Sequence, residues 1–123
     1  MATRSNIIIK DAEGLKAIIY HHFNGSPKGV GAELQMFLRH ITDDENNPTN
    51  LAEFICAQDK EYIPRNIIND DIDYLYTINT ETKTLHYQDI IDGKPEFLCR
   101  YSPHNRHKRS GSKESYQGKT FAT

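Results

Sequence analysis

Residues 30–41 form the one stretch of this chain with a clear helical period, and strand-like runs lie on both sides of it. Apolar residues recur there three or four positions apart, as on the buried face of an amphipathic helix: Val30, Leu34, Phe37, Leu38 and Ile41. A second, shorter helix is expected over about 50–60, where Asn50 and Glu53 have the spacing of a capping box. Any fold for this chain must therefore place two helices between its strands.

The flanking runs are rich in β-branched and aromatic residues. Before the helices, 5–10 and 17–23 are separated by a short turn, which is typical of a β-hairpin. After the helices, strands are expected over 74–79, 84–87 and 96–101, with Asp92-Gly93 as a turn before the last. The order β-β-α-α-β-β-β predicts an α+β fold in which two helices cover one face of an antiparallel sheet.

Charge is divided unevenly along the chain, although the formal net charge is only −2. Residues 102–123 hold five basic residues against one acidic, a net +4, while 41–101 carry −8 and 1–40 carry +2. We therefore expect one α+β domain over 1–101 and a basic tail over 102–123, disordered or docked on a partner subunit. A +4 tail lying across the acidic stretch of a neighbouring subunit would favour a homo-oligomer.

Several classes of protein are excluded by what the sequence lacks. No apolar run approaches the roughly 20 residues of a membrane helix, and the N-terminus has no signal-peptide pattern. The two cysteines cannot form a disulfide scaffold or a four-cysteine zinc site. His104 and His107 have a spacing that suits a metal only if the tail is helical, and no cysteine, histidine or carboxylate group accompanies them at ligand spacing. No nucleophile–base set is present. We expect a soluble cytoplasmic protein with no membrane partner, metal or cofactor, and not an enzyme.

The segment 25–31, Gly-Ser-Pro-Lys-Gly-Val-Gly, is the most informative local feature. It stands between a strand and the N-terminus of the best helix, where free backbone N–H groups and the helix dipole favour an anion. Glycine and proline also make tight strand-to-helix turns with no ligand, so both interpretations stay open. The ligand-binding interpretation uses the loop, nearby aromatic and histidine side chains, and basic residues elsewhere: Arg4, Tyr20, His22, Phe23, Gly25, Ser26, Lys28, Gly29, Gly31, Arg100, Arg106 and Arg109.

The tail itself offers a further binding surface. Arg106 and Arg109, with the other basic residues of 102–123, could contact nucleic-acid phosphates. A solvated terminus explains the same composition equally well.

Two N-terminal segments together carry a resemblance. Thr3-Arg4-Ser5 precedes an isoleucine-rich strand, and an aromatic and a histidine precede Asn24-Gly25-Ser26-Pro27 and a helix. Over about 40 residues the chain resembles small phage and prophage accessory proteins that open with Thr-Arg-Ser. Their loop has the pattern (Asp/Asn)-Gly-x-Pro-x-x-x-Gly. The resemblance implies a counter-defence role in the cytoplasm of a bacterial host. In size and architecture the chain is also similar to the anti-Thoeris sponge proteins, oligomers that sequester nucleotide immune signals without cleaving them.

Two functions therefore stand as hypotheses. The first is sequestration, without cleavage, of a nucleotide second messenger of the cyclic nucleotide or cyclic ADP-ribose type. The second is inhibition of a host defence nuclease or CRISPR effector by protein–protein contact through the acidic stretch 41–101.

Overall fold

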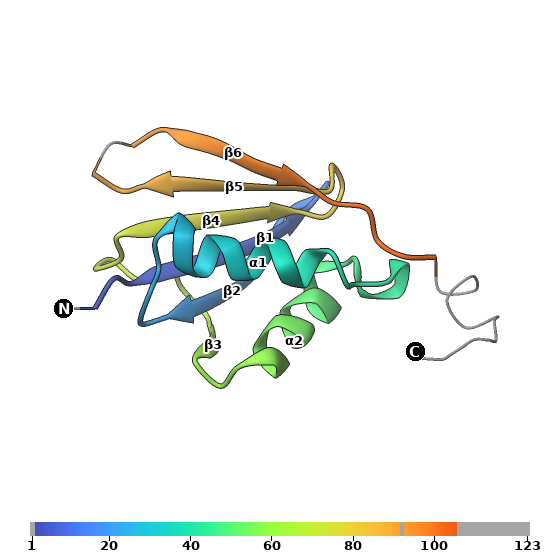
Figure 1. Cartoon of the computed structure of the whole chain (residues 1–123), viewed down its shortest axis with the longest axis horizontal. Coiled ribbons are helices and arrows are strands. Elements are labelled where there is room, and N and C mark those ends of the chain that lie inside the picture. Colours follow the sequence, from blue (N-terminus) through green and yellow to red (C-terminus); the bar gives the residue numbers. More distant parts are fainter. Residues whose placement is uncertain (1, 92, 106–123) are drawn as a thin grey trace.

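The N-terminal strands form the hairpin that the sequence predicts. β1 (Ser5–Asp11) and β2 (Gly14–His21) pair antiparallel. Gly14 takes a φ of 123° at the turn, a value that only glycine adopts without strain. In this computed structural model, which describes residues 2–91 and 93–105, β1 lies at the middle of the sheet with β2 beside it (Figure 1).

The two expected helices follow the hairpin. A short π-helical turn, η1 (Pro27–Gly31), runs directly into α1 (Ala32–Leu38). A 3₁₀ turn, η2 (Asp43–Glu45), then precedes α2 (Pro48–Gln58).

The predicted cap of the second helix is wrong. Asn47 is the N-cap of α2, and its side chain accepts a 2.9 Å hydrogen bond from the backbone N–H of Asn50. Pro48 follows at the first helical position, where its missing N–H costs nothing. A capping box does occur nearby, between Thr42 and Glu45 at η2.

Four more strands complete a six-stranded sheet: β3 (Tyr62–Arg65), β4 (Tyr74–Asn79), β5 (Thr84–Asp89) and β6 (Pro95–Arg100). The strand order is β3-β2-β1-β4-β5-β6. The α+β class is thus confirmed, but the predicted five-stranded, wholly antiparallel sheet is wrong. β1 and β4 run parallel, because both helices and β3 lie between them and return the chain to the end of the sheet where β1 starts.

Strand β3 has no counterpart in the prediction, because Ile63-Pro64 is also typical of a helix end or a loop. Proline cannot donate to a strand ladder, so it is tolerated mainly at a sheet edge. β3 is an edge strand and pairs only with β2 within the described part of the chain. Its position at the edge explains how Pro64 fits within a strand.

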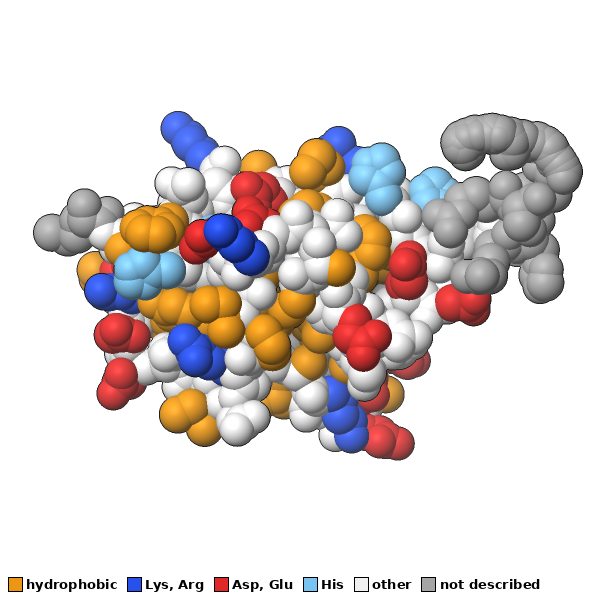
Figure 2. Space-filling model, turned by 90° about the horizontal axis from the view of Figure 1, so that it is seen from below, with side chains coloured by type: hydrophobic (Ala, Val, Ile, Leu, Met, Phe, Trp, Pro, Cys, Tyr) orange, Lys and Arg blue, Asp and Glu red, His pale blue; other side chains and the backbone are white. Residues whose placement is uncertain are grey.

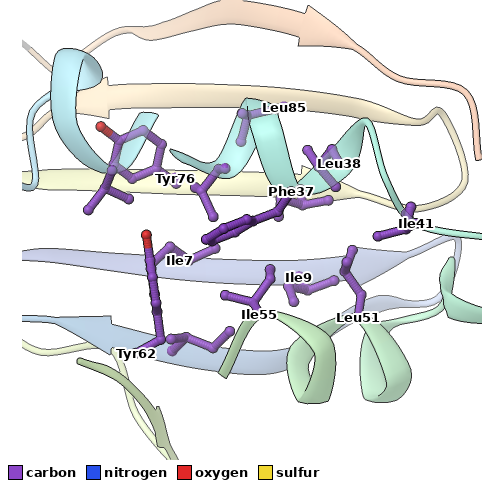
Figure 3. Packing of buried hydrophobic residues seen from close by; sticks show 14 of the residues in the cluster. Ile7, Ile9, Phe37, Leu38, Ile41, Leu51, Ile55, Tyr62, Tyr76 and Leu85 are labelled. Carbon is purple, nitrogen blue, oxygen red and sulfur yellow. The ribbon is translucent and has the colours of Figure 1, made fainter. Parts of the chain in front are cut away.

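One apolar layer joins the helices to the sheet. Both helices lie on the same side of the sheet (Figure 1), and their side chains meet those of the central strands (Figure 3). The sheet contributes Ile7, Ile9, Ile19, Tyr76, Ile78 and Leu85, and the helical segments contribute Val30, Leu34, Phe37, Leu38, Leu51 and Ile55. Each fully buried side chain of this kind stabilises the fold by about 1.5–3 kcal/mol.

Beyond β6 the chain stays against the domain. Tyr101 is buried, and the backbone of His104 accepts a 2.9 Å hydrogen bond from the N–H of Asp43. Residues 102–105, assigned above to the tail, therefore lie along η2. Residues 106–123, with Arg106 and Arg109, are outside the described residues, as is Asp92 of the predicted turn. None of the helices described here has the length and apolar character needed to cross a bilayer.

Candidate functional site

The glycine loop uses its own backbone donors. The N–H of Gly25 donates to the carbonyl of Thr3 at 2.9 Å, and that of Val30 donates to Asn24 at 2.7 Å. The N–H groups of Gly29 and Gly31 both donate to the carbonyl of Ser26, at 2.9 and 3.3 Å. Four of the donors expected to cradle an anion are therefore engaged within the protein, and an anion would have to break these bonds to reach them.

Close packing explains why three positions of the loop are glycine. A Cβ atom at Gly25 would lie 2.8 Å from the carbonyl oxygen of Thr3, and one at Gly29 would lie 2.1 Å from that of Asn24. At Gly31 it would lie 3.3 Å from the hydroxyl of Tyr76. The tight-turn interpretation thus accounts for Gly25, Gly29 and Gly31 with no ligand present.

The aromatic side chains predicted around the loop lie at the end of β2, with Tyr20 on the strand and His22 and Phe23 directly after it, and most of them are engaged. Tyr20 is only 7% exposed, and the guanidinium of Arg65 lies 5.2 Å from the centre of its ring. The Tyr20 hydroxyl is 2.8 Å from Nδ1 of His22, whose ring meets that of Phe23 edge-on. Phe23 is 51% exposed. Phe23 is thus open to stack on a base, whereas the ring of Tyr20 is covered.

Carboxylates near the start of β1 partly neutralise the positive charge of Arg4. The Arg4 guanidinium lies 3.8 Å from Asp71, and the backbone N–H of Arg4 donates to Asp73 at 2.9 Å. Lys28 is exposed in η1, and Ser26 before it is half-buried. An anion here would face aspartates as well as arginines.

Arg100 lies elsewhere. It pairs with Thr84 in the sheet, and the same row continues through Asn79 to Lys10 at the far end of β1. Arg4 directly precedes the first residue of β1, so the two arginines lie at opposite ends of the strands. At about 3.3 Å a residue, the five steps from Ser5 to Lys10 alone span about 17 Å. The structure therefore divides the predicted site into two.

A pocket forms where Arg100 meets the end of α1. Arg39, the C-cap residue of α1, and Arg100, the last residue of β6, both line it. Its remaining walls come from Gln35, Cys99, Tyr101 and Ser102, and its volume is about 280 Å³. Among the described residues, neither guanidinium lies within ion-pairing distance of a carboxylate. We call this site the two-arginine pocket.

Contacts around the pocket hold its walls in place. The Nε2 atom of His104 lies 2.8 Å from the backbone oxygen of Arg39, which fastens the chain after β6 to the end of α1. The Tyr101 hydroxyl donates a 2.6 Å hydrogen bond to the side chain of Asn46. Burial raises the pKa of the Cys99 thiol, and the positive charge of Arg39 partly opposes that rise.

Sequence reasoning missed Arg39 and Gln35. Both belong to the expected helix, but no local pattern connects them with Arg100, which lies 61 positions after Arg39 in the chain. Paired guanidinium groups without carboxylate partners are suited to bind a phosphate, which accepts two parallel hydrogen bonds from each.

Comparisons with known proteins give no guide to the ligand: no protein-family model, curated protein or solved structure matches this chain. Within 2–91 and 93–105, no three histidine, cysteine or acidic side chains gather closely enough to share a metal ion.

Proposed function

We propose that this chain binds a phosphate-bearing nucleotide and holds it without cleaving it, with the phosphate in the two-arginine pocket. The observation that carries the proposal is the convergence of Arg39 and Arg100 on one cavity, with no carboxylate paired to either in the described structure. Both arginines are exposed residues, so an incoming phosphate can reach them, and each guanidinium can donate two parallel hydrogen bonds to it.

The dimensions of the pocket suggest how a nucleotide would sit. At about 280 Å³ it lies just below the usual size of a small-molecule site, so it would enclose the phosphate and leave the base outside. Gln35 adds an amide that can donate to a phosphate oxygen or to the sugar.

The resemblance of the first 40 residues to phage accessory proteins supports a counter-defence role. The similarity in size and architecture to the anti-Thoeris sponge proteins supports a nucleotide immune signal as the ligand. If the chain sequesters such a signal, it must bind the nucleotide tightly and release it chemically intact. The test is calorimetry of the full chain with cyclic dinucleotides, cyclic trinucleotides and cyclic ADP-ribose isomers, followed by mass spectrometry of the recovered ligand. Binding of one class with the ligand recovered intact is expected. Binding of none, or recovery of a hydrolysed product, would overturn the proposal.

A second function, inhibition of a host defence nuclease or CRISPR effector by protein contact, is favoured by one exposed segment. Ile67 is 71% exposed and Ile68 is 41% exposed, and the exposed Asp70 and Asp71 follow them. Figure 2, however, shows acidic and basic side chains interspersed over the surface around α2 and β3, with no single acidic face there. Ile67→Ser with Asp70→Asn should weaken binding to a purified effector at least tenfold; unchanged affinity would contradict contact through this segment.

A further inference from the structure

A second pocket lies beside the glycine loop, at the end of the sheet opposite the two-arginine pocket. Its floor consists of side chains on one face of three neighbouring strands, where Tyr74 pairs with Asp89 and Tyr87 pairs with Glu96. Pro27 of η1 forms one wall, and Lys94 also lines the cavity. Each tyrosine of this pocket thus lies opposite a carboxylate on the next strand.

This combination is suited to a cation. Tyr74 and Tyr87 both line the cavity, with their ring centres 6.4 Å apart and the rings tilted by 48°, and the face of an aromatic ring attracts a cation. Asp89 accepts a 3.0 Å hydrogen bond from the N–H of Ile91, which fixes its carboxylate. In the part of the chain that the structure describes, neither Asp89 nor Glu96 forms an ion pair, even with Lys94. At about 200 Å³, the cavity matches the end of an amino-acid side chain.

The direction of β6 indicates where such a side chain would come from. Glu96, the second residue of β6, lines the pocket, and the strand runs away from it to Arg100. The chain beyond Arg100 then continues along η2, at the opposite end of the sheet (Figure 1). Residues 102–105 therefore lie on the side of the domain away from its own pocket. The chain that follows them is strongly basic in sequence, and we infer that a neighbouring copy receives it.

We propose that this pocket binds an arginine or lysine side chain from residues 106–119 of a second copy of the chain. Two copies exchanging these segments would bury two such pockets in one symmetric pair. The charges are complementary, since the donor segment is basic and the receiving stretch 41–101 carries −8. The proposal is independent of the nucleotide site, which lies at the other end of the sheet.

The test is the mass of the full chain in solution, measured by light scattering across a concentration series at low and high salt. The wild-type chain should have twice the mass of 14.2 kDa and should dissociate as salt rises. A wild-type chain that stays monomeric at every concentration would overturn the proposal.

Variants locate the contact. Asp89→Asn with Glu96→Gln should raise the dimer dissociation constant at least tenfold, and the asparagine can still accept the hydrogen bond from Ile91. The matched control, Glu53→Gln with Glu81→Gln, removes the same charge at exposed positions elsewhere and should leave the constant unchanged. Lys94→Gln should tighten the dimer several-fold, since it removes the competing cation. Equal constants for the pocket variant and the control would overturn the proposal, and circular dichroism checks that all variants fold.

Discussion

The Tyr76 hydroxyl donates a 2.7 Å hydrogen bond to the carbonyl oxygen of Gly25, and so joins the middle of the sheet to the glycine loop. Tyr76 is fully buried in β4, and Gly25 is packed against the backbone of Thr3. The loop that looks most like a ligand cradle is thus held by the protein itself. In the two-arginine pocket, by contrast, neither guanidinium forms an ion pair with a carboxylate of the residues that the structure describes.

Tyr76→Phe should destabilise the fold by about 1–3 kcal/mol, since it leaves the buried Gly25 carbonyl without its side-chain donor while preserving the ring. Urea unfolding measures the effect. Tyr87→Phe is the control, because Tyr87 lies on the neighbouring strand and is less buried. It should lower the free energy of unfolding by less than Tyr76→Phe does. A Tyr76→Phe variant as stable as wild type would show that the bond does not hold the loop.

Gly29→Ala should destabilise the chain severely, because the added methyl would lie 2.1 Å from the carbonyl oxygen of Asn24 and the loop would have to move. We expect a loss of at least about 2–3 kcal/mol, as for other substitutions that overpack a fixed backbone. Lys28→Ala, at the exposed neighbouring position, should change stability by less than about 0.5 kcal/mol. Comparable melting temperatures for the two variants would contradict the packing role of Gly29.

The sequence predicts the local elements well, because they depend on neighbours in the chain. The hairpin turn at Gly14 and the periodic helix that begins at Ala32 are examples. Pairing between distant segments leaves no such local signal, so the parallel contact of β1 with β4 was not predicted. For the same reason, Arg100 could be predicted as a binding residue from its charge alone, whereas Arg39, which lines the same pocket, could not be connected with it.

Stability should fall in alkaline solution. Burial raises the pKa of Tyr62, Tyr76 and Tyr101 above the ordinary value of 10.0, and a hydrogen bond to Glu33 adds to the rise at Tyr62. The unfolded chain releases these protons near pH 10 while the folded chain keeps them. The stabilisation is therefore complete below pH 10 and is lost progressively above it, by up to about 1.4 kcal/mol per pH unit for each tyrosine.

Urea midpoints between pH 8 and pH 11.5 measure this dependence. Tyr101→Phe removes one of the three titrating groups and should make the decline between pH 10 and 11.5 shallower than in wild type. An identical decline in both chains would contradict the assignment of a raised pKa to Tyr101.

Cys99 offers a direct report on the two-arginine pocket, because it lines the cavity and is half-buried. In a Cys56→Ser background, saturating pyrophosphate should slow alkylation of Cys99 by N-ethylmaleimide several-fold. Sodium chloride at matched ionic strength is the control and should have little effect. An alkylation rate unaffected by pyrophosphate would mean that phosphate does not occupy the pocket.

The most direct test of the account is calorimetry of three full-length variants with the nucleotide panel. Arg39→Gln and Arg100→Gln should each weaken binding about 10- to 100-fold, since a hydrogen bond to a charged group is worth about 1.5–3 kcal/mol. Arg4→Gln removes the same charge at the other end of the sheet and should bind like wild type. Loss of binding in Arg4→Gln, with Arg39→Gln and Arg100→Gln unchanged, would place the ligand at the glycine loop and contradict the assignment of the two-arginine pocket.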